Sequence, residues 1–138
     1  MELSKLIIPS KPMPFEYPGI DGLTFTIAHL SRRTINDIRK KHTKPVRNKL
    51  TNSFIDELDE DGFMREYSAS VLCGWEGLNT ENIQEFIVIE DCELMDVPYS
   101  EENAYQLMIN SQELEQWVAD HLTDIENFRN KGSSSREE

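Results

Sequence analysis

Apolar and polar residues alternate near the start of the chain, in the stretch GLTFTIAHL. Leu23, Phe25 and Ile27 are separated by threonines, and this two-residue period predicts a half-buried strand. In the next stretch, SRRTINDIRKKH, two isoleucines three residues apart follow a serine that suits a helix N-cap, which predicts a helix. Basic residues in its last turn suit the negative end of the helix dipole, and Pro45 prevents the helix from continuing.

A second helix is predicted for DEDGFMREYSASVLCGW, because acidic residues gather at its start and apolar residues recur on one face. We expect it to end at Trp75, which lies between Gly74 and Gly77; either glycine can end a helix in the left-handed conformation. Residues 46–58, which precede this helix, have an ambiguous pattern and are expected to be extended.

Two further helices are predicted in the C-terminal third. Residues 79–97 are first apolar and then acidic, which favours a short helix or strand followed by a loop. Ser100 is the expected N-cap of the next helix, since two glutamates follow it. The last helix has the most regular pattern, with Ser111 at its start and Gly132 at its end. Its stripe consists of Leu114, Trp117, Val118, His121, Leu122, Ile125 and Phe128.

These periods predict an α+β fold that is mostly helical, with a small N-terminal sheet and three or four helices. Residues 1–19 hold four of the six prolines and are expected to form an extended arm. The domain itself is expected to span residues 20–131, and residues 132–138 to be a disordered tail.

The composition suits one globular domain, with 138 residues of which 38% are hydrophobic. A net charge of −12 argues against nucleic-acid binding, which rests on clustered Lys and Arg. The charge is uneven, because residues 32–49 are strongly basic with Asp37 as their single acid, whereas the chain from Asp56 onward is strongly acidic. We expect these two parts either to face each other or to form solvated faces.

No apolar run approaches the roughly twenty residues of a membrane span. Residues 6–8 are too short an apolar run for the core of a signal peptide. We therefore expect a cytoplasmic protein without a membrane partner. Cys73 and Cys92 form neither a disulfide framework nor a metal pattern, and both thiols are expected to be reduced.

No arrangement of residues predicts an enzyme. His29, His42 and His121 lie in three separate elements, and His121 shares its helix face with apolar residues, which is typical of a packed histidine. The acidic groups lack the order of a calcium loop, and the sequence has no phosphate-binding glycine loop, nucleophile elbow or zinc spacing. We therefore expect no catalytic residue, no metal and no cofactor.

Three motifs, VLCGWEGL, VPYSEENAYQLM and WVADHLTDIENFRNK, resemble in their order the tail assembly chaperones of long-tailed bacteriophages. The shared pattern is a helix ending in Gly-Trp-Glu-Gly-Leu, an acidic insert, a helix beginning at Ser-x-Glu-Asn, and a last helix ending in Asn-Phe. FTIAHLSRRTINDIRKK resembles the strand and basic helix that precede them in the family. The resemblance covers residues 20–131, and residues 79–97 are longer than the pattern needs.

The resemblance implies a non-enzymatic function. Such chaperones hold the long, helical tape measure protein soluble until the tail tube polymerises around it, so the protein is expected in the host cytoplasm and absent from the mature virion. The family often makes a longer product by ribosomal frameshifting, which would add the tail tube protein as a partner. Two alternatives stay open: a minor structural tail protein retained in the virion, and an acidic inhibitor that mimics DNA towards a host enzyme.

A group of apolar residues around the glycine-flanked turn is expected to bind the tape measure protein. The run is more apolar than a surface loop needs, and the acidic residues around it would keep a complex soluble. The alternative is that these residues complete the core, and for Trp75 we favour core packing over a role as an aromatic anchor. The predicted binding residues are Trp75, Leu78, Ile83, Phe86 and Ile87.

Overall fold

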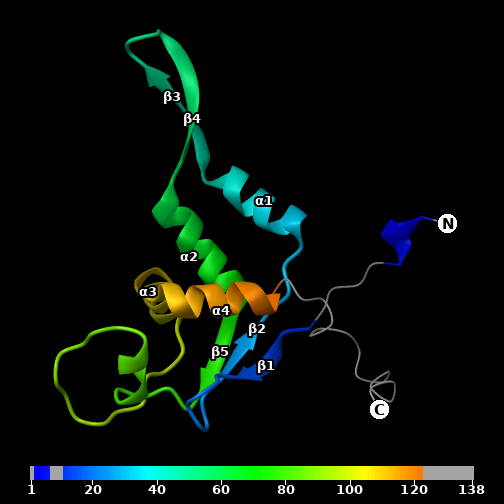
Figure 1. The fold of residues 1–138 in the computed structure, drawn as a ribbon. Coiled ribbons are helices and arrows are strands. Elements are labelled where there is room, and N and C mark those ends of the chain that lie inside the picture. The colour runs from blue at the N-terminus through cyan, green and yellow to red at the C-terminus, as the bar shows by residue number, and fades with distance from the viewer. Residues whose placement is uncertain (1, 7–10, 123–138) are drawn as a thin grey trace.

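The computed structural model describes residues 2–6 and 11–122 (Figure 1). Within these residues the chain forms four α-helices and five strands in two small sheets, which confirms the predicted α+β class. The helices are α1 Arg32–Lys41, α2 Glu60–Val71, α3 Glu101–Asn110 and α4 Gln112–Leu122, with short 3-10 helices η1 Leu3–Lys5 and η2 Asn82–Glu85. The strands are β1 Met13–Glu16, β2 Thr24–Ile27, β3 Thr43–Asn48, β4 Ser53–Leu58 and β5 Leu72–Glu76.

The central sheet has the strand order β1-β2-β5, and both pairs are antiparallel. The predicted alternation holds, because Leu23, Phe25 and Ile27 are completely buried while the threonines between them are not. Part of the N-terminal segment that was expected to form an extended arm is attached to this sheet. Strand β1 pairs with β2, and Tyr17 is buried in the core, so residues 13–17 belong to the domain rather than to a separate extension.

The helices close one core with this sheet. Helix α4 packs against β2, and α2 leads directly into β5 (Figure 1). Helix α3 contacts both α2 and α4. The N-caps expected from the sequence are confirmed, since the hydroxyls of Ser31, Ser100 and Ser111 each accept a hydrogen bond from a backbone N–H three residues on. The buried residues of α4 are Leu114, Val118 and Leu122. The expected end of this helix at Gly132 lies outside the described residues.

Helix α2 is shorter than the sequence predicted. It ends at Val71, and the residues expected to form its last turn are the strand β5, with Phe25 opposite Trp75 and Thr26 opposite Gly74. The prediction of a helix up to Trp75 was therefore wrong. The reason is that β5 supplies the second neighbour of the buried strand β2, and this pairing satisfies backbone groups that a longer helix would leave unpaired in β2.

The segment between α1 and α2 is a β-hairpin made of β3 and β4. The sequence predicted an extended conformation for residues 46–58, but it did not predict the hairpin. The register pairs Val46 with Ile55 and Arg47 with Phe54. The hairpin extends beyond α1 and α2, and its principal contacts join its own two strands (Figure 1).

Candidate partner-binding surface

The residues predicted to bind a partner lie mainly in the core. Leu78, Ile83 and Phe86 are only 2%, 7% and 8% exposed, whereas Trp75 and Ile87 are half-buried and packed against the core. The expectation of an exposed patch is therefore wrong for the first three residues, and the structure agrees with the alternative that they complete the core. A binding role for Trp75 and Ile87 stays a prediction.

The burial of these residues follows from the folding of the segment 79–97, which we call the insert. The Asn79 side chain accepts hydrogen bonds from two backbone N–H groups, at 2.8 and 2.9 Å, and thereby starts the short helix η2. This turn directs Phe86 onto the sheet, where its ring centroid lies 4.9 Å from that of Tyr17 and 6.1 Å from that of Phe25. The apolar half of the insert thus closes one end of the core.

Trp75 joins the sheet to the end of the insert. Its indole Nε1 donates a hydrogen bond of 2.7 Å to the carbonyl of Val97, and its ring packs edge-on against Tyr99 with 5.0 Å between centroids. The Tyr99 hydroxyl in turn donates to the carbonyl of Leu72, at 2.6 Å. This tryptophan therefore has a structural task that accounts for its place in β5.

Among the described residues, seven of the ten exposed large apolar side chains gather in two separate places, and Leu3, Leu6 and Ile109 lie outside both. One group lies on the β3–β4 hairpin, and the other lies on the outer part of the insert, at the opposite end of the molecule (Figure 1). The hairpin group consists of Val46, Leu50, Phe54 and Ile55. The insert group consists of Val88, Leu94 and Met95. Sequence reasoning missed the hairpin group, although the irregular apolar pattern of residues 46–58 was the signal for it.

The hairpin continues a basic surface that begins in α1. We call residues 32–58 the basic arm. It has eight of the 14 Lys and Arg residues of the chain and three of its 26 acidic residues, which is a net charge of +5. The rest of the chain has six basic and 23 acidic residues, a net charge of −17. The molecule is therefore strongly polarised.

The base of the basic arm is fixed to α2. His42 Nε2 lies 2.9 Å from Glu66 Oε1, and Lys41 Nζ lies 3.1 Å from the same oxygen. Hydrogen bonds from His42 and then from Lys41 hold the pKa of the Glu66 carboxyl below its usual value. The guanidinium of Arg39 lies 4.6 Å from the centroid of the Phe63 ring. The arm thus projects from a defined support.

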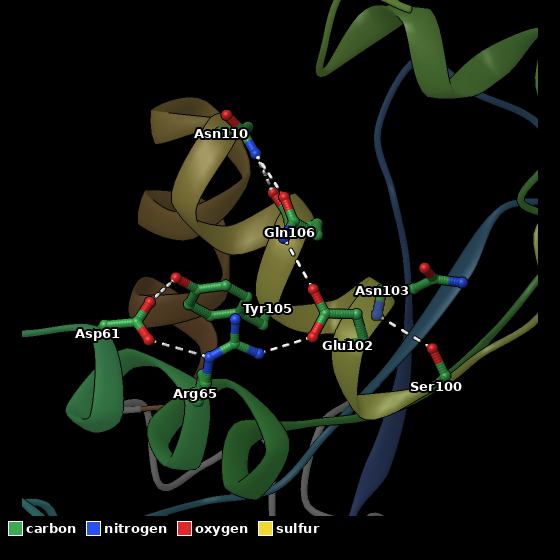
Figure 2. Close-up of polar contacts among 8 residues, drawn as sticks. All are labelled: Asp61, Arg65, Ser100, Glu102, Asn103, Tyr105, Gln106 and Asn110. Atoms are coloured by element: carbon green, nitrogen blue, oxygen red, sulfur yellow. Dashed lines mark hydrogen bonds and ion pairs between the residues drawn. The ribbon is translucent and has the colours of Figure 1, made fainter.

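A second polar cluster joins α2 to α3 (Figure 2). Arg65 donates to Asp61 in its own helix, at 3.1 Å, and to Glu102 at the start of α3, at 2.6 Å. Its guanidinium also lies 4.0 Å from the centroid of the Tyr105 ring, and the Tyr105 hydroxyl donates to Asp61. Figure 2 shows Arg65 held between the two carboxylates, which is the arrangement of a structural clamp rather than an open site.

The clamp predicts a pH-dependent stability. The hydrogen bond from Tyr105, and next that from Arg65, lowers the pKa of Asp61. Hydrogen bonds from Gln106, and next from Arg65, lower the pKa of Glu102. Because these pKa values are lower in the folded protein, the carboxylates stabilise it fully above the ordinary carboxyl pKa of about 4. This contribution is lost as the pH falls below that value and through the lowered pKa values of the folded protein.

Arg65→Gln is therefore expected to lower the thermal midpoint at pH 7, and its difference from the parent should shrink as the pH falls below about 4. Thermal unfolding followed by circular dichroism between pH 7 and pH 3 measures this. Arg32→Gln is the control, since Arg32 is exposed and has no ion pair among the described residues. A difference that does not change with pH would contradict the electrostatic role of the clamp.

Several nucleophilic and titratable side chains are partly buried or hydrogen-bonded within the fold. Burial, followed by the charge of Glu113, raises the pKa of Tyr17 to about 12, and burial raises the pKa of the Cys73 thiol. His29 Nδ1 lies 2.6 Å from the carbonyl oxygen of Leu122, and His121 Nδ1 lies 2.9 Å from that of Trp117. Residues 2–6 and 11–122 contain no group of three or more His, Cys, Asp or Glu side chains that could hold a metal ion.

Among the helices in the part of the chain that the structure describes, none is long and apolar enough to cross a membrane.

Comparison with known proteins places the chain in a phage lineage. No curated protein and no solved structure matches the sequence significantly. A family model described as YdaY prophage protein matches residues 28–138, which include the basic arm, the insert and all four α-helices. Because the match covers well over half of the 138 residues, the chain belongs to the YdaY family of prophage proteins.

Proposed function

We propose that this protein is a non-enzymatic tail assembly chaperone. It binds the phage tape measure protein in the host cytoplasm, keeps that protein soluble until the tail tube polymerises, and is absent from the mature virion. Membership of a prophage protein family supports the phage setting. The ordered motifs from residue 20 to residue 131 support the finer assignment, because they resemble those of tail assembly chaperones.

The observation that carries the proposal is the exposure of apolar side chains on a domain whose core is already closed. Val46, Phe54 and Ile55 of the hairpin contribute nothing to the core, although burial would stabilise them. Exposed apolar groups on a small domain are typical of surfaces that bind another protein. A tape measure protein offers matching apolar stripes along its helices, and uncovered stripes of that kind aggregate.

The acidic body of the molecule suits the same role. A net charge of −17 outside the basic arm keeps a complex soluble once the apolar surfaces of both proteins are covered. The proposal includes no cofactor, metal, membrane or nucleic acid. A longer product made by frameshifting would add the tail tube protein as a second partner.

Co-expression tests the proposal directly. The parent protein is expected to carry the candidate tape measure protein of the same phage into the soluble fraction, in a complex that survives high salt because its contacts are mainly apolar. Mass spectrometry of purified phage particles should then detect the tape measure protein but not the chaperone. A tape measure protein that stays insoluble would contradict the chaperone function. Finding the protein in particles would instead indicate a minor structural tail protein.

A further inference from the structure

We propose that the basic arm is the docking surface for the tape measure protein, and that it binds amphipathic helical segments whose apolar stripe is flanked by acidic residues. This inference rests on the proposed function and deepens it, since it names the surface and the chemistry of the segment that the surface takes. It replaces the insert, whose apolar half is in the core, with the hairpin as the principal binding element.

The hairpin has apolar side chains on both of its faces. Successive residues of a strand point to opposite sides, so the register places Arg47 and Phe54 on one face and Val46 and Ile55 on the other. Phe54 is 70% exposed and Ile55 is 53% exposed. A two-stranded hairpin without a third strand or a helix against it is only marginally stable in water. A partner that covers these side chains would stabilise the hairpin as well as the complex.

The charge of the arm selects the partner. Among the described residues, only Lys41 of its eight basic side chains forms an ion pair. The other seven are exposed and have no carboxylate partner in residues 2–6 and 11–122, although Arg39 packs on Phe63 and Arg47 donates to Asn52. They therefore complement acidic groups that flank an apolar stripe. The rest of the chain, with its net charge of −17, repels an acidic segment. This repulsion steers the segment to the basic arm.

The backbone of the hairpin favours a helix over a strand as the bound segment. Pro45 has no backbone N–H and therefore cannot donate from β3 to an added strand. Asp56 and Glu57 place two adjacent charges in β4, which discourages pairing with another strand at that edge. The hairpin thus offers its side chains, and the apolar stripe of a helix lies across such a surface.

Two variants of the arm test the inference in the full chain. Phe54→Ser with Ile55→Ser removes exposed apolar contacts, and Lys44→Glu with Lys49→Glu reverses charge on the hairpin. Because all four side chains are exposed, the thermal unfolding midpoint of each variant should stay close to that of the parent. The matched controls are Val88→Ser with Leu94→Ser in the insert, and Lys5→Glu with Lys11→Glu outside the arm.

The first measurement is the amount of co-expressed tape measure protein in the soluble fraction. The apolar variant should lose most of it, and both controls should retain the parent level. The charge-reversal variant should lose part of it, because exposed charges act mainly on encounter and are screened by salt. If the arm variants solubilise the tape measure protein as well as the parent does, the docking surface is wrong while the chaperone function stands. If the parent protein itself does not solubilise the tape measure protein, the proposed function is wrong. The peptide measurement described next then tests the docking surface independently of that function.

The second measurement uses two synthetic helical peptides with the same leucine stripe, one flanked by glutamates and the other by lysines. Fluorescence anisotropy should show that the glutamate peptide binds the parent at least about tenfold more tightly than it binds either arm variant, the loss typical of one or two central contacts. The lysine peptide should bind the charge-reversal variant no more weakly than the parent, because the reversal removes cations that repel it. Equal binding of the glutamate peptide to parent and arm variants would overturn the inference.

Discussion

Phe86→Asp is expected to unfold the protein. Phe86 is buried against the rings of Tyr17 and Phe25, so the change removes an aromatic side chain from the core and puts a carboxylate in its place. Loss of a buried phenylalanine alone costs about 3–5 kcal/mol. Burying a carboxylate without a partner adds to this cost. Small domains have a total stability of about 5–15 kcal/mol, so little or none remains.

Far-UV circular dichroism and a urea titration measure the effect, and Val88→Asp is the matched control. Val88 lies in the same insert and the variant gains the same charge, but this side chain is fully exposed, so its urea midpoint should equal that of the parent. If Phe86→Asp kept the midpoint of the parent, the insert would not be packed as described. An exposed binding patch around Phe86 would then be the better interpretation.

Gly77→Ala is expected to be the second severe change. Gly77 has a φ of +85°, and an added Cβ would lie 2.1 Å from the carbonyl oxygen of Gly22. The left-handed conformation costs a residue with a Cβ about 1–2 kcal/mol. Forcing the backbone of the neighbouring turn aside adds about 1–3 kcal/mol. We expect the two terms together to lower the urea midpoint clearly and to loosen the insert, which begins two residues later.

Gly19→Ala separates these two terms. Gly19 has a φ of +89°, close to that of Gly77, but no atom lies within 4 Å of its added Cβ. This control should therefore show only the conformational cost, and the difference between the two variants measures the close approach to Gly22. Equal loss of stability in both variants would show that the contact with Gly22 is not important.

The two glycines that flank Trp75 have different reasons for being there. Gly77 lies where a positive φ and a close backbone contact coincide, as described above. Gly74 lies inside β5 opposite Thr26, and an added Cβ would meet only ordinary contacts at 3.9 Å. The sequence pattern Gly-Trp-Glu-Gly is thus not a helix ending, because α2 already ends at Val71. It is a strand whose last residues turn the chain into the insert.

The sequence could predict features that depend on neighbouring residues. The alternation of Leu23, Phe25 and Ile27 is local, and it correctly indicated a buried strand face. The N-caps Ser31 and Ser100 were predictable for the same reason, because a cap bonds to a backbone group three residues away. The uneven charge is also a property of the sequence alone, and it marked residues 32–49 as unusual.

The tertiary structure decided the features that depend on residues distant along the chain. Residues 72–76 satisfy a helical pattern, yet they form a strand because Trp75 pairs with Phe25, fifty positions earlier. The apolar half of the insert is as hydrophobic as a binding patch, yet Phe86 reaches Tyr17 and is covered. Phe54 has no such distant partner and stays exposed. Periodicity reports which side chains share a face, but only the three-dimensional packing determines whether the rest of the chain covers that face.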